Sequence, residues 1–152
     1  MMRRLRARTA DDRGAELIEL ALVFPILLLL VAGIVDFGFL FQRYEVVTNA
    51  AREGARVGVL PNYTVADVQQ RVANYLASGG LTAAAPAPTV TYSTETLPSG
   101  ATVPVVTVVV QYPSQFTFIG PIAAMVGGSG WGAITLQAAS VMRVEGGAGA
   151  GS

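Results

Sequence analysis

Hydrophobic residues fill one long stretch near the N-terminus of this chain. Between Glu19 and Asp36, residues 20–35 carry no charged side chain. A helix rises about 1.5 Å per residue, so about twenty apolar residues cross the roughly 30 Å hydrocarbon core of a bilayer. The pattern therefore predicts a membrane-spanning helix over residues 15–41, with Asp36 close to its outer boundary.

The helical pattern continues beyond this apolar stretch. After Phe41 the next proline is Pro61, and small residues recur at every fourth position, at Ala50, Gly54 and Gly58. We expect the same helix to continue through residues 42–60, outside the membrane. A stripe of small residues lets another backbone approach closely. It could pack the helix on the chain's own sheet or on a neighbouring subunit, and the sequence leaves both open.

Shorter periodic segments follow and predict a small domain over residues 61–145. Apolar residues recur at helical spacing over residues 65–77, and Thr64 with Asp67 three positions later forms a capping signal. Alternating β-branched residues predict strands, and an apolar run interrupted by Gly-Pro predicts one short helix. The strands are residues 89–94, 103–112 and 134–144, and the short helix lies within residues 116–126. The fold class is therefore α+β, followed by a Gly-rich flexible tail over residues 146–152.

Arginines precede the membrane-spanning stretch and set its expected orientation. They are Arg3, Arg4, Arg6, Arg8 and Arg13, opposed by Asp11 and Asp12. Positive charge stays on the cytoplasmic side, so we expect a cytoplasmic, irregular leader over residues 1–13 and an extracytoplasmic domain. An ordinary secretory signal has a short apolar core followed by small residues. Here the apolar run is longer, and the small pair Gly14 and Ala15 lies before it.

Composition narrows the chemistry that the chain can perform. Its 152 residues include no cysteine, no histidine and no lysine, and the formal net charge is zero. Disulfides, thiolate or histidine catalysis and the usual zinc or iron sites are excluded, and no basic face suits nucleic acid. The acids Asp67, Glu95 and Glu145 are scattered along the domain. We expect no enzyme, cofactor, metal site or small-molecule substrate.

The junction between leader and apolar stretch resembles the processing site of a type IV prepilin. The motif is Gly14-Ala15-Glu16-Leu17-Ile18-Glu19. Glycine puts no side chain in the way of a peptidase, and a carboxylate in the first turn is favoured by the helix dipole. The resemblance implies a cut after Gly14, a new N-terminus at Ala15 and an amine that can pair with Glu19. The alternative is that Glu19 simply lies at headgroup depth without a role.

A narrower resemblance covers residues 14–60, which are similar to the N-terminal segment of TadE-like proteins of tight-adherence (Flp, type IVc) pilus systems. The matching residues are Glu19, Ala21, Leu22, Val23 and Pro25, then Gly33 to Gly38, then Asn49 to Arg56 with the sequence NAAREGAR. Residues 134–145 resemble the closing strand of that family more weakly. The resemblance implies a pilin-like α+β fold, in which one long N-terminal helix packs on a small antiparallel sheet.

It also implies a function in the bacterial inner membrane. The chain is expected to be a minor pilin or pseudopilin, processed by a prepilin peptidase and acting structurally in pilus assembly or adhesion. Its expected partners are the membrane, the peptidase, other pilins or pseudopilins and the pilus assembly platform. Major pilins of this kind are little more than the helix, whereas this chain adds about ninety residues after Leu60.

Some alternatives remain open at this point. The chain could instead be a signal-anchored extracytoplasmic binding module or a pseudopilin of another secretion system, although the Asn49 to Arg56 run disfavours the latter. Pro25 removes a hydrogen bond inside the membrane-spanning helix. It is either a flexible point used when subunits leave the bilayer or an ordinary membrane proline.

Overall fold

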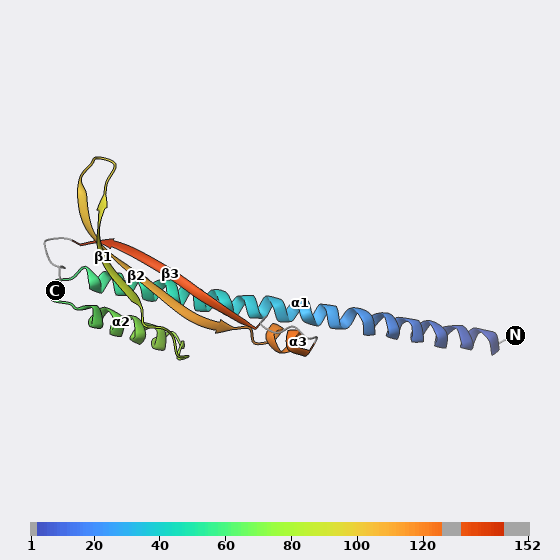
Figure 1. The fold of residues 1–152 in the computed structure, drawn as a ribbon. Coiled ribbons are helices and arrows are strands. Elements are labelled where there is room, and N and C mark those ends of the chain that lie inside the picture. The colour runs from blue at the N-terminus through green and yellow to red at the C-terminus, as the bar shows by residue number, and fades with distance from the viewer. Residues whose placement is uncertain (1–2, 126–131, 145–152) are drawn as a thin grey trace.

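One very long helix organises the molecule, and a small sheet and two shorter helices lie along it (Figure 1). The computed structural model describes residues 3–125 and 132–144. The expected Gly-rich tail over residues 146–152 lies outside the described residues. The described part joins a helix that extends far beyond the domain to an antiparallel sheet, and the expected α+β fold is confirmed.

Helix α1 runs from Arg3 to Gly58 without interruption. An irregular leader was expected over residues 1–13, and that expectation was wrong, because the helix already begins at Arg3. Arginine, leucine and alanine are strong helix formers, and no proline precedes Pro25. Nothing in the leader therefore stops the helix from extending towards the N-terminus.

The N-terminal half of α1 is bare, in the sense that neither the sheet nor α2 covers it. Part of it is long and apolar enough to cross a membrane, with a mean hydropathy of 2.8 over its best window, none of which is buried by the rest of the protein. Large apolar side chains from Leu17 to Phe41 are exposed along this half. A helix that is apolar on all sides and uncovered by protein is typical of a membrane span.

Helix α1 ends at Gly58, and the chain turns through Asn62, which has a left-handed φ of 67°. Asparagine tolerates this conformation better than most residues. Helix α2 then runs from Val65 to Ser78 and begins with the predicted capping box. The Thr64 hydroxyl accepts from the Asp67 backbone N–H, and the Thr64 backbone N–H donates to the Asp67 carboxylate at 2.8 Å.

Three antiparallel strands form the sheet in the order β1-β2-β3. They are β1 from Thr89 to Thr96, β2 from Thr102 to Gln115 and β3 from Ala133 to Arg143. The short helix α3 runs from Ile119 to Met125, between β2 and β3. The predicted segments are thus found. Strands β1 and β2 extend up to three residues beyond the expected limits, and β3 is shifted by one residue towards the N-terminus.

The central strand β2 contains two prolines, which cannot donate to a sheet ladder. The Pro104 carbonyl accepts from Val144, so the backbone of Pro104 faces the β3 side, just beyond the end of β3 at Arg143. The N–H and C=O groups of successive residues point to opposite neighbouring strands, so the backbone groups of Pro113 point towards the β1 side. The β1 strand begins opposite Val109, four residues earlier. Neither proline therefore removes a bond to a neighbouring strand.

The hydrophobic core lies between the C-terminal half of α1, helix α2 and one face of the sheet. Alternate residues of β2 point into it, as the period of two in a strand requires. The largest fully buried side chains are all valines: Val47 of α1, Val68 and Val72 of α2, and Val106, Val108 and Val110 of β2. Helix α3 lies apart from this core, beside the bare half of α1 (Figure 1).

Candidate functional site

The expected processing segment lies on the exposed part of α1. Gly14, Ala15 and Glu19 are all exposed and within the helix. A Cβ atom added to Gly14 would meet nothing within 4 Å. The structure therefore places these residues where another protein can reach them, and among the described residues there is open space next to Gly14 for a side chain.

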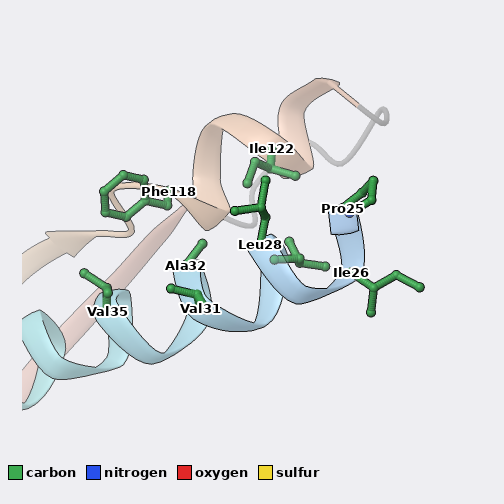
Figure 2. A pocket seen from close by; sticks show the side chains of 9 residues that line it. Pro25, Ile26, Leu28, Val31, Ala32, Val35, Phe118 and Ile122 are labelled. Carbon is green, nitrogen blue, oxygen red and sulfur yellow. The ribbon is translucent and has the colours of Figure 1, made fainter. Parts of the chain in front are cut away.

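Pro25 lies in the same exposed half, and α1 continues through it as a helix. Its ring lies on the side of α1 that faces α3 (Figure 2). The structure thus places Pro25 beside a second element of the chain, an arrangement that the sequence did not indicate.

The stripe of small residues is buried inside the chain's own domain. A Cβ atom added to Gly54 would lie 2.5 Å from Cγ2 of Val72 and 3.2 Å from Cγ1 of Val108. Helices α1 and α2 and the sheet therefore meet at Gly54. Ala50 is fully buried, and the carbonyl of Gly58 accepts from the Tyr92 hydroxyl at 3.1 Å. Of the two open alternatives, the structure places the stripe against the chain's own sheet and α2.

Glu53 joins two helices through ion pairs. Its carboxylate accepts from Arg56 one turn later at 2.9 Å and from Nη2 of Arg71 on α2 at 2.6 Å. Hydrogen bonds from Arg56 and then Arg71 lower the pKa of Glu53 from 4.5 to about 2, against the opposing effect of burial. Only 17% of the Glu53 side chain is exposed. The spacing of three residues between Glu53 and Arg56 on one helix indicates that pair in the sequence. No pattern in the sequence indicates the pair with Arg71, which lies on α2.

Replacing Glu53 with glutamine is expected to lower the free energy of unfolding by about 1–2 kcal/mol at pH 7. Both arginines are more than half exposed, so solvent screens the pairs and reduces their contribution. Because the folded pKa is depressed, the stabilisation is complete above about pH 4.5 and is lost as pH falls towards 2. Urea unfolding at pH 7 and pH 3 measures both effects.

The matched control for this prediction is Glu45→Gln, at an exposed position on the same helix. This control is expected to change the urea midpoint by less than Glu53→Gln does. A difference between Glu53→Gln and wild type that stays constant from pH 7 to pH 3 would contradict the assigned role of Glu53.

Asp36 is a charged side chain buried on an otherwise exposed part of α1. It is only 2% exposed, although its neighbours along α1 are exposed apolar residues. Its Oδ1 accepts from the backbone N–H of Thr117 at 2.8 Å and of Phe118 at 3.2 Å. Its Oδ2 accepts from Phe118 at 2.9 Å and from Ile119 at 2.7 Å. One carboxylate therefore holds three successive backbone donors at the start of α3.

Two further contacts join the same face of α1 to the segment before α3. Nη1 of Arg43 donates to the Ser114 hydroxyl and to the Gln115 carbonyl, both at 2.8 Å. The rings of Phe37 and Phe116 meet edge to face with centroids 6.2 Å apart. We refer to Asp36, Arg43 and their partners over residues 114–119 as the α1 clamp. It fixes the end of β2 and the start of α3 to the long helix.

The sequence indicated that Asp36 lies at a boundary but not what it binds. An acidic residue within an apolar stretch indicates that its carboxylate has a buried partner. That partner consists of backbone N–H groups, which every residue except proline carries. No side-chain pattern over residues 117–119 could therefore reveal it.

An apolar groove of about 680 Å³ lies between α1 and α3, directly beside the α1 clamp (Figure 2). Phe118 and Ile122 form one wall. The opposite wall consists of Pro25, Ile26, Leu28, Leu29, Val31, Ala32 and Val35 of α1. No charged or hydrogen-bonding side chain is among these nine residues, so the groove suits a hydrocarbon surface and has no group for chemistry.

The acidic residues that composition left as candidates do not form a site in the described part of the chain. Asp67 caps α2 and Glu95 is exposed on β1, while Glu145 lies outside the described residues. Hydrogen bonding to Thr64 lowers the pKa of Asp67, which fits a capping role. Among the described residues, no group of three acidic, cysteine or histidine side chains could hold a metal ion.

Comparison with known proteins finds a family match in the N-terminal part of the chain. The model of the family described as TadE-like protein matches residues 14–56, which confirms the resemblance found in the N-terminal segment. The weaker resemblance over residues 134–145 stays a prediction. No curated protein and no solved structure matches the chain. The matched residues include the motif around Gly14, Asp36 and two residues of the small-residue stripe, Ala50 and Gly54. They end two residues before α1 does.

Proposed function

We propose that this chain is a minor pilin or pseudopilin of a tight-adherence pilus system, because its residues 14–56 match the TadE-like family. It acts structurally, in assembly of the pilus or in adhesion. The observation that carries this proposal is the continuity of α1. One helix joins the exposed Gly14 motif, the bare apolar half and the buried stripe of the domain. A subunit of this shape can sit in a bilayer or pack its apolar half against other subunits.

The proposed location is the bacterial inner membrane, crossed once. The apolar length of α1 supports a single-pass anchor. The arginines before Gly14 favour a cytoplasmic N-terminus, so that the domain lies outside the cytoplasm. Its partners are then the membrane, other pilins or pseudopilins and the assembly platform.

A prepilin peptidase is the proposed processing enzyme, cutting after Gly14. The freed amine of Ala15 would lie one helical turn from Glu19. A carboxylate within lipid is costly unless it is paired, and this amine supplies a positive partner at that distance. Exposure of Gly14, Ala15 and Glu19 supports access by the peptidase.

The domain after α1 supports a minor rather than a major component. In the described residues it has three strands and a capped helix, which share one buried core with the C-terminal half of α1. A major pilin of the same kind needs little beyond the helix. The domain therefore provides a surface that a filament made of bare helices lacks.

Cells lacking this chain are expected to yield few or no surface pili, and wild-type protein is expected to restore them. Gly14→Phe is expected not to restore them, because the phenylalanine blocks the cut while leaving the folding of the chain intact. Pili sheared from cells and quantified on gels measure this. The matched control is Glu16→Gln, at a neighbouring exposed position. Normal pilus yield without the chain would contradict the role in assembly, and normal attachment of the same cells to a surface would contradict the role in adhesion.

A further inference from the structure

Helix α3 lies beside a part of α1 that the proposed anchor places inside the bilayer. Asp36 marks the outer boundary, and the groove next to α3 extends along α1 from Val35 back to Pro25 (Figure 2). From Asp36 to Pro25 the helix rises about 16 Å, at about 1.5 Å per residue. This is about half of a hydrocarbon core roughly 30 Å thick. A segment from the domain therefore reaches into the outer leaflet.

A short helix can enter hydrocarbon only if its first backbone donors are bonded. The first N–H groups of a helix have no partner within it, and each unbonded group in lipid is costly. Here the carboxylate of Asp36 accepts from residues 117–119. Pro121 has no N–H, and the N–H of Ile122 bonds to the carbonyl of Phe118 at 3.4 Å. The start of α3 is thus largely satisfied by the protein itself.

The surface of α3 is also suited to lipid. No charged residue occurs from Phe116 to Met125. The side chain of Phe118 is 46% exposed and that of Ile122 is 40% exposed, and both lie next to the exposed apolar face of α1. In water this combined patch would be unfavourable, whereas in a leaflet the acyl chains cover it.

We propose that α3 is a re-entrant helix, held in the outer leaflet by Asp36, and that the groove between α1 and α3 holds a phospholipid acyl chain. The proposal rests on the membrane placement given above. The fully apolar lining and the depth along α1 favour an acyl chain, because lipid tails are what surround a membrane helix at this level. The α1 clamp then sets how deeply the domain sits on the membrane.

Spin labels measure the depth directly, since the chain has no cysteine of its own. The full-length protein is labelled with a nitroxide at Ile122→Cys and placed in phosphatidylcholine vesicles. Oxygen partitions into hydrocarbon, whereas a nickel chelate stays in water. The label at residue 122 is expected to collide more with oxygen than with nickel, as is a second label at the exposed Ala124→Cys. The matched references are Leu22→Cys on bare α1 and Tyr63→Cys on the domain.

The outcomes separate this proposal from the anchor on which it rests. If the labels at residues 122 and 124 favour nickel as the residue 63 label does, while the residue 22 label favours oxygen, the re-entrant helix is wrong and the anchor stands. If the residue 22 label also favours nickel, the anchor itself is wrong. A low oxygen collision rate at residue 122, with spectral broadening that disappears on dilution with unlabelled protein, would place a second copy in the groove and overturn the acyl chain.

Asp36→Asn provides the test of what holds α3 in place. Asparagine keeps the size of the side chain but offers a single acceptor oxygen and no charge. In this background, the label at residue 122 is expected to lose oxygen collisions and gain nickel collisions, while the label at residue 22 does not change. An unchanged ratio at residue 122 would remove Asp36 from the proposal.

Discussion

Replacing Asp36 with alanine is expected to detach the start of α3 from α1. The substitution leaves the backbone N–H groups of residues 117–119 without their acceptor. Hydrogen bonds to a charged group contribute about 1.5–3 kcal/mol each when they are largely buried. Since the freed segment can rearrange and find water, we expect a net loss of about 3 kcal/mol, concentrated at the α1 clamp. Limited proteolysis of the detergent-solubilised chain is expected to show faster cleavage between residues 113 and 125.

Two further variants distinguish the carboxylate from general damage to the helix. Asp36→Asn retains one acceptor and is expected to show intermediate cleavage. Arg43→Gln removes the donor to Ser114 and Gln115 but leaves Asp36 in place, so a smaller effect is expected. Cleavage of Asp36→Ala at the wild-type rate would show that the segment is held by its apolar contacts alone.

Gly54→Ala is expected to destabilise the domain by about 2 kcal/mol, the typical cost of overpacking a core. The added methyl would lie 2.5 Å from Cγ2 of Val72, closer than carbon atoms approach. Val72 is fully buried and β-branched, so its side chain has little freedom to move away. Either α2 shifts outward or the helices separate at this point. Urea unfolding of the detergent-solubilised chain, followed by circular dichroism, measures the loss.

Gly38→Ala is the matched control, because it is the same substitution in the same helix. A Cβ atom at Gly38 would meet nothing within 4 Å. Alanine is the better helix former by about 1 kcal/mol, so this variant is expected to be as stable as wild type or slightly more so. Equal destabilisation by both substitutions would mean that close packing at Gly54 does not hold the domain together.

Local sequence patterns predicted the elements of this fold well. The uncharged stretch of residues 20–35, the capping residues Thr64 and Asp67 and the β-branched run of β2 each act over a few neighbouring positions. Period and capping are properties of such short windows, so they can be recognised without knowledge of the rest of the chain. The helical leader was missed because charge was taken as a sign of irregular structure, although arginine is a strong helix former.

The contacts between distant segments could not be predicted in the same way. Glu53 pairs with Arg71, which lies 18 residues away on another helix, and no local pattern links the two positions. Asp36 bonds to backbone more than 80 residues away, and backbone leaves no mark in a sequence. The small-residue stripe was recognised, yet only the structure shows that it packs inside the chain rather than between subunits.

The most direct test of the central claim is the intact mass of the protein isolated from membranes of cells that contain the matching prepilin peptidase. The account predicts a wild-type mass that begins at Ala15, and a Gly14→Phe variant that retains residues 1–14. The variant serves as its own folding control, because position 14 has no packing partner within 4 Å. A wild-type protein that retains Met1 under these conditions would contradict the account and leave a signal-anchored domain.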